Sequence, residues 1–157
     1  EHAKLIIGGE NKSEYGESLK KMVNELGLEN RVIFTGRLDD IKPFLSISHI
    51  FIFSPVKASE GISNSVLKAM AAGILSYGSD VPGLRDQLKE FQDQLFEPEN
   101  PGAIANKIMH AMNMSNEERE DRIKRQKDLI IKNYAKETEI LGLQNLYSSL
   151  IKYDRKI

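Results

Sequence analysis

The sequence predicts an α/β fold: a Rossmann-like parallel sheet flanked by helices, with a helical carboxy-terminal tail. Short apolar runs bounded by Gly, Pro, Asp or Ser alternate with longer segments whose apolar residues repeat at helical spacing. One run, Ile50 to Phe53, is apolar at every position, which is typical of a parallel strand covered on both faces. The chain has 157 residues, which suits one domain of ordinary size, so we expect a single domain over 1–157.

The first third of the chain alternates strand and helix. Strands are expected at 4–8, 31–35 and 49–53, and helices at 14–26 and around 41–48. In the first helix Leu19, Met22, Val23 and Leu26 fall on one face, and Gly27 supplies a stop.

The remainder is expected to finish the sheet and then become helical. Helices are predicted at 63–72 and from the turn at 79–83 toward residue 88, with strands at 74–78 and 94–97. Asn100 before Pro101 reads as a helix N-cap, and Ser115 with Glu118 as a capping box. A final helix carries the apolar residues Ile140, Leu143, Tyr147, Leu150 and Ile151.

Composition excludes several classes of function. Lys plus Arg total 22 and Asp plus Glu total 23, so no basic excess indicates a nucleic-acid partner. There is no Cys, and three scattered His residues show no ligand spacing, so we expect no disulfide and no metal site. No apolar run is long enough for a transmembrane segment and the start does not resemble a signal peptide, so a cytoplasmic domain is the default prediction.

Ligands of open parallel sheets bind at the carboxyl ends of the strands, so the loops after Gly8, Thr35, Phe53 and Tyr77 are the candidate site. Gly8 and the glycine after it offer backbone amides, although a plain turn explains them equally well.

The loop after the third strand is the most informative. Gly61, Ser63, Asn64 and Ser65 surround a helix start, where free N–H groups and the positive helix end attract phosphate or sugar oxygens. Glu60 precedes them, and its carboxylate is suited to accept hydrogen bonds from sugar hydroxyls. The local pattern alone somewhat favours a plainer interpretation, in which Ser63 or Asn64 merely caps the helix and Glu60 is solvated.

Residues 59–73, SEGISNSVLKAMAAG, resemble the signature of family 4 (group 1) retaining glycosyltransferases of the GT-B fold. That signature has Glu-Gly, an apolar run, a second Glu and Ala-Met-Ala-Cys/Ala-Gly. The segments 31–36, 49–55 and 78–83 resemble further parts of the family in the same order. The resemblance implies half of a GT-B enzyme: the carboxy-terminal nucleotide-sugar-binding domain, without its first strand and without the amino-terminal acceptor domain.

By this resemblance Glu60 is the catalytic candidate and faces the donor sugar. It also implies that the amides of Gly61, Ile62 and Ser63 approach the sugar and diphosphate. The donor-binding residues implied in this way are Gly8, Gly36, Arg37, Gly61, Ile62, Ser63, Asn64 and Lys68. Specifically, Gly36 and Arg37 are expected beside the base, and a solvated Arg37 is an equal alternative. Arg37 with Lys42 is not equated with the Gly-Arg and Lys pair that grips the diphosphate in the family, since that pair precedes the segment resembling 4–8.

Lys68 is the main departure from the family. It stands where the family has its second Glu, which accepts hydrogen bonds from both ribose hydroxyls. Lysine only donates, and an unfilled pairing of this kind typically costs about 1–3 kcal/mol. Lys68 is therefore expected either to reach phosphate or to face solvent, and its presence puts normal donor binding in question.

The resemblance implies a hexosyltransferase that moves a sugar from an NDP-sugar, with UDP-sugar favoured, to a polysaccharide or glycolipid acceptor held by the missing domain. It implies no cofactor, an isolated fragment that is inactive, and a cytoplasmic location, with contact to the inner membrane face through the missing domain left open. A catalytically lapsed binding or scaffold domain is the chief alternative, and a sugar-nucleotide epimerase of like architecture is a third.

In the family the final helix crosses back to the first domain, which predicts a partly exposed apolar face on that helix; packing on the local core is the alternative.

Overall fold

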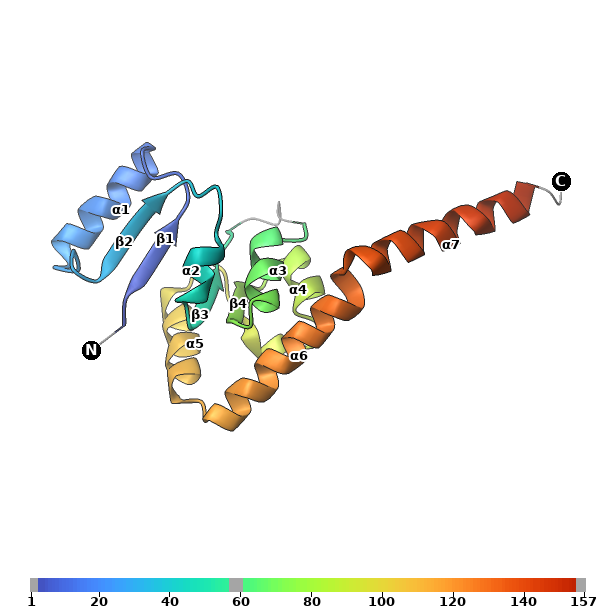
Figure 1. Cartoon of the computed structure of the whole chain (residues 1–157). Helices are drawn as coiled ribbons and strands as arrows, with labels where there is room; N and C mark the ends of the chain where they lie inside the picture. The colour runs from blue at the N-terminus through green and yellow to red at the C-terminus, as the bar shows by residue number, and fades with distance from the viewer. Residues whose placement is uncertain (1–2, 57–60, 155–157) are drawn as a thin grey trace. The chain divides into compact units, whose positions relative to one another are not determined.

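The computed structural model describes residues 3–56 and 61–154, and side chains up to residue 151 (Figure 1). The chain divides into two compact units, Glu1–Pro43 and Phe44–Ile157. Each unit contains its own parallel sheet, of two strands in the first and three in the second. The predicted parallel α/β fold is thus confirmed.

The first unit is a strand, helix, strand arrangement. Its elements are β1 (Leu5–Gly8), α1 (Glu14–Glu25) and β2 (Val32–Gly36). Gly16 of α1 lies so close to the loop before it that an added Cβ would sit 2.6 Å from the backbone of Asn11, which requires glycine there. On the predicted apolar face Leu19 and Val23 are partly buried, whereas Met22 and Leu26 are exposed within their unit.

The second unit holds the larger sheet and most of the helices. The boundary between the two units falls within α2 (Lys42–Ser46). The elements that follow are β3 (Ile50–Phe53), α3 (Asn64–Ala71), β4 (Leu75–Ser79), α4 (Pro82–Gln87), the 3-10 helix η1 (Gln92–Gln94), β5 (Leu95–Phe96), α5 (Pro101–Asn113), α6 (Asn116–Tyr134) and α7 (Lys136–Asp154). β4 lies between β3 and β5, and both pairings are parallel.

Helices cover both faces of this sheet, as an apolar parallel strand requires. All five residues of β4 are buried. One core cluster joins Val66 and Met70 of α3 to residues of α4 and α6, and the other joins Leu75 and Tyr77 of β4 to Ala111 of α5. β4 is therefore the centre of a three-layer packing arrangement.

The predicted N-caps of the two helices after the sheet are present. The Asn100 side chain accepts a hydrogen bond from the Ala103 N–H at 2.9 Å, and the Ser115 hydroxyl accepts one from the Glu118 N–H at 3.1 Å. Local sequence signals therefore set where α5 and α6 begin.

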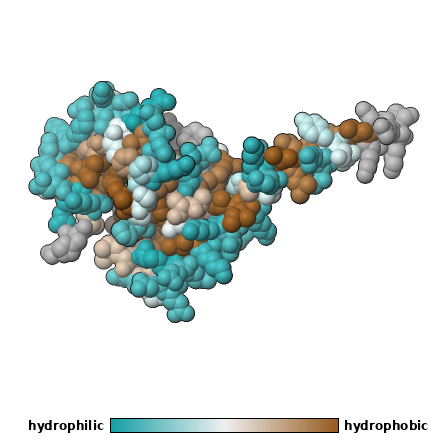
Figure 2. All heavy atoms as spheres, in the orientation of Figure 1, coloured by the Kyte–Doolittle hydropathy of each residue, from teal (hydrophilic) through white to brown (hydrophobic). Residues whose placement is uncertain are grey.

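The last helix, α7, exposes its apolar side chains. Ile140, Leu143, Tyr147 and Ile151 expose between 44% and 63% of their surface, which confirms the prediction of an exposed face. Figure 1 shows α7 continuing beyond α6, and Figure 2 shows hydrophobic side chains along its length.

Candidate functional site

The start of α3 is the central feature of the candidate site. Ser63 is the N-cap residue, with an extended backbone at φ −84° and ψ 111°, and only 4% of its surface is exposed. Its carbonyl accepts the first helical hydrogen bond from the Leu67 N–H at 3.1 Å. Its hydroxyl makes no capping bond and instead lies 3.0 Å from the hydroxyl of Ser65.

The backbone of Ser63 is held by a side chain distant in sequence. The Ser63 N–H donates to Oε1 of Gln87 at 2.8 Å, and Nε2 of Gln87 donates to the Ser63 carbonyl at 3.0 Å. Gln87 is the last residue of α4 and is fully buried. We call this pair of hydrogen bonds the Gln87 clamp. The Ser63 N–H was expected to approach a diphosphate, but it donates its hydrogen bond to Gln87 within the protein.

The next three amides are the free donors of this helix start. Among the described residues, none accepts a hydrogen bond from the N–H of Asn64, Ser65 or Val66. The first amides of a helix have no partner within it, and the positive end of the helix dipole lies there. This arrangement of donors can bind an anion such as phosphate.

Other helices of the chain use one such amide for capping. Ser13, Asn100 and Ser115 each accept a hydrogen bond from an N–H of the first turn, in α1, α5 and α6 respectively. In α3 the Ser63 side chain leaves all three first-turn amides without a bond to a described side chain.

The remaining candidates of the second unit surround this helix start. Gly61, Ile62 and Asn64 are exposed, and so is Lys68, which lies one turn further along α3. Lys68 forms no ion pair with any carboxylate in the described part of the chain. Glu60 lies outside the described residues, so its position beside these donors stays a prediction.

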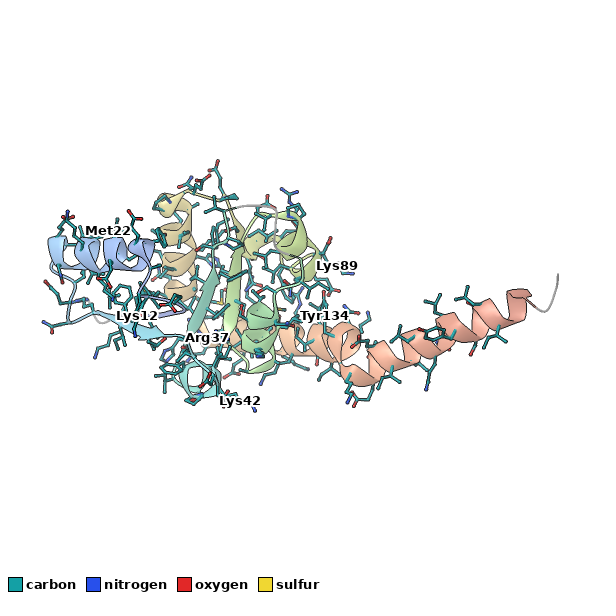
Figure 3. All side chains as sticks on the ribbon, turned by 90° about the horizontal axis from the view of Figure 1, so that it is seen from above. Lys12, Met22, Arg37, Lys42, Lys89 and Tyr134 are labelled. Atoms are coloured by element: carbon teal, nitrogen blue, oxygen red, sulfur yellow. The ribbon has the colours of Figure 1, made fainter. Side chains whose placement is uncertain are left out.

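Three candidates belong to the first unit, where β1 and β2 end. Gly8 pairs with Gly36 across the two strands, and the Gly9 N–H donates to the Gly36 carbonyl at 3.0 Å. Gly36 has φ +68°, a conformation that favours glycine. Arg37 follows directly and is exposed; it is labelled in Figure 3 with Lys12, which lies in the loop after β1.

A polar depression of about 340 Å³ lies where β4 and β5 end. Asp80 follows β4 and forms an ion pair with Arg85, whose pKa is raised above its ordinary value by the hydrogen bond to that carboxylate. Glu97 follows β5 and accepts a hydrogen bond from the Asn100 side chain at 2.7 Å. Both acidic groups are thus already paired within the protein.

Gln87 is not among the residues predicted from the sequence. It is separated from Ser63 by 24 residues, and no local motif connects the two. Nothing in the local sequence distinguishes Gln87 from Arg85 and Asp86, the other polar residues of α4.

The described residues contain no group of three or more His, Asp or Glu side chains placed to hold a metal ion. None of the helices in the described part of the chain is both long and apolar enough to cross a membrane.

Comparison with known sequences gives a family match over most of the chain. Residues 1–129 match the family described as "Glycosyl transferases group 1". The lipopolysaccharide core biosynthesis glycosyltransferase LpsE of Rhizobium meliloti is 34% identical over 71 residues, which is 44% of this chain and 20% of that protein.

Solved structures share the fold. A glycosyltransferase from Rickettsia africae superimposes with a TM-score of 0.85 at 18% identity, over 96% of this chain and 40% of that one. Alr3699/HepE from Anabaena, in complex with UDP, gives 0.83 at 19% identity, over 94% of this chain and 41% of that one. This chain therefore spans about 40% of the length of these two structures.

Proposed function

The chain belongs to the group 1 glycosyl transferases, and on that premise we propose that it is the nucleotide-sugar-binding domain of a retaining glycosyltransferase. The full enzyme would transfer a sugar from an NDP-sugar, with UDP-sugar favoured, to a polysaccharide or glycolipid acceptor. The observation that carries the proposal is the start of α3, where three adjacent amides have no acceptor among the described residues.

The chemistry of transfer explains why such donors are useful. A retaining transfer develops positive charge on the sugar ring while the nucleoside diphosphate leaves with negative charge. The amides of Asn64, Ser65 and Val66 and the positive end of α3 would stabilise that leaving group. Glu60, by its place in the sequence, would accept hydrogen bonds from the donor sugar.

Further support for a nucleotide-sugar donor comes from the structural neighbours. Alr3699/HepE is described in complex with UDP and with UDP-glucose. We propose that Gly36 and Arg37, by their places in the sequence, border the base of a nucleotide, and that the acceptor site belongs to another domain of a longer enzyme. The short share of each neighbour that this chain covers supports that second point.

Lys68 favours a second candidate function, a catalytically lapsed binding or scaffold domain. Its exposed ammonium has no ion pair among the described residues and only donates hydrogen bonds. A ribose whose hydroxyls need an acceptor would find none at this position.

Calorimetric titration of the chain with UDP and with GDP tests the proposal. We expect UDP to bind with a Kd below 1 mM, and Lys68→Glu to bind about tenfold more tightly, since it would supply an acceptor worth about 1–3 kcal/mol. Lys136→Glu, at an exposed lysine of α7, makes the same charge change and should leave the Kd unaltered. Absence of binding at millimolar concentrations of both nucleotides, in the wild type and in Lys68→Glu, would support the lapsed domain instead.

A further inference from the structure

We propose that Gln87 is a positioning residue for the donor site, which holds the start of α3 so that its first-turn amides remain available to the diphosphate. This inference rests on the proposed function and concerns a residue that never touches the ligand. It assigns a role in binding to a buried side chain of a neighbouring helix.

The geometry of the Gln87 clamp is unusually complete. One planar amide meets both the N–H and the carbonyl of Ser63, at 2.8 Å and 3.0 Å. Two hydrogen bonds, one to the N–H and one to the carbonyl of the same residue, fix the position and the orientation of its backbone. Because Gln87 is fully buried and Ser63 nearly so, water does not compete for either bond.

The clamp itself is attached to the most buried part of the unit. Leu84 and Leu88 of α4 are fully buried, and Leu84 fits against Gly78 of β4 so closely that an added Cβ would be 2.8 Å from its Cδ1. The start of α3 is therefore held, through α4, by the central strand of the sheet.

A buried glutamine is also an uncommon way to fill a core. An apolar residue would avoid the cost of burying an amide, which at Gln87 is offset by the two hydrogen bonds to Ser63. Here the bonds orient Ser63 without using the amides of Asn64, Ser65 or Val66. A capping side chain would have taken one of those donors, as happens in α1, α5 and α6.

The test compares UDP binding by two variants of the full chain. Gln87→Leu removes both hydrogen bonds, and we expect its Kd for UDP to rise by about tenfold or more at every pH. In Gln87→Glu the acceptor remains, but an ionised carboxylate cannot donate to the Ser63 carbonyl. Its Kd should rise by about tenfold at pH 8 and return toward the wild-type value at pH 5.5, because burial raises the pKa of the introduced carboxyl and protonation restores the donor.

Ionisation of UDP changes the Kd of the variant and of the wild type equally, so the ratio of the two Kd values at each pH cancels this effect. Gln126→Glu is the matched control, since Gln126 is equally buried but donates only to Gln94. We expect it to lower stability in the same pH range and to leave the Kd ratio near one. Circular dichroism at each pH identifies the conditions in which every variant is folded. If Gln87→Leu does not fold, the change in the Kd of Gln87→Glu between pH 5.5 and 6.5 tests the role of the clamp.

The outcomes separate the two proposals. Wild-type binding of UDP together with unchanged binding in both Gln87 variants would overturn the positioning role and leave the proposed function standing. A pH-dependent Kd ratio in Gln126→Glu equal to that in Gln87→Glu would also overturn it, because the effect would then follow from general destabilisation. A wild type that binds no UDP would overturn the proposed function and the positioning role with it.

Discussion

Replacing Gly78 by alanine would test the contact that holds α4 on the sheet. The added Cβ would meet Cδ1 of Leu84 at 2.8 Å, Cδ1 of Leu88 at 3.4 Å and Cβ of Leu84 at 3.6 Å. Carbon atoms pack best at roughly 3.5–4.0 Å, so the end of the Leu84 side chain must move. Leu84 and Leu88 are both fully buried, so the space into which it could move is already filled.

The expected cost follows from these contacts. Overpacking of a filled core costs about 1–3 kcal/mol, and replacing glycine by alanine in a compatible conformation returns about 0.4–1 kcal/mol through the unfolded chain. We therefore expect Gly78→Ala to lower the free energy of unfolding by about 0.5–2 kcal/mol. With a urea dependence of about 1–3 kcal/mol per molar, the midpoint would fall by about 0.5–1 M.

Urea unfolding followed by circular dichroism at 222 nm would measure this shift. Gly142→Ala is the matched control, since Gly142 lies in α7 with no atom within 4 Å of an added Cβ; it should not destabilise the chain. In the Leu84→Ala background the new methyl group has room, so adding Gly78→Ala should cost at least about 1 kcal/mol less than in the wild type. A midpoint for Gly78→Ala at or above the wild-type value, or strict additivity with Leu84→Ala, would refute the packing argument.

Three further predictions concern stability. Tyr77→Phe should leave the free energy of unfolding at pH 7 unchanged or slightly higher, because its buried hydroxyl has no partner among the described residues; a loss above about 1 kcal/mol in urea unfolding would contradict this. Burial raises the pKa of Tyr77 above its ordinary value of 10.0, so the unfolded chain ionises first and stability should fall as the pH rises above that value, less steeply in Tyr77→Phe. Ser115→Ala should cost about 1 kcal/mol through the lost cap and Ser63→Ala less, since the Ser63 side chain makes no capping hydrogen bond; thermal unfolding that gave the reverse order would argue against these assignments. Gly73→Ala should cost about 1–3 kcal/mol, since Gly73 has φ +80° and an added Cβ would lie 2.7 Å from Cε of Lys127. A variant with the wild-type melting temperature would show that neither the backbone conformation nor the contact with Lys127 requires glycine.

Much of the fold could be predicted because its signals are local. The caps at Asn100 and Ser115 and the unbroken apolar strand at Ile50 to Phe53 are each contained within a few residues, and the structure confirms them. Periodicity also identified the apolar faces of α1 and α7. Periodicity does not tell what covers those faces. Met22 and Leu26 are therefore exposed within their unit although the pattern of α1 suggested burial.

The helix start at the candidate site was predictable from the sequence, but its hydrogen bonds were not. The sequence of the loop before α3 located the helix start, yet the hydrogen bonds of Ser63 depend on Gln87, which approaches only after the chain has passed through β4 and α4. Pairing between distant residues leaves no period and no motif in a single sequence. Ser63 is the N-cap residue of α3, as one interpretation of the local pattern had it, but its side chain makes no capping hydrogen bond.

The burial of all five β4 residues has a consequence for motion. A central strand with covered faces and two paired edges releases its backbone hydrogens only when the whole unit opens, so β4 should contain the slowest-exchanging amides of residues 44–157. α7, with its exposed side chains, should exchange orders of magnitude faster and fray independently. Deuterium uptake would then separate slowly exchanging amides in β4, against which α3 and α4 pack, from rapidly exchanging amides in α7, whose opening leaves β4 intact.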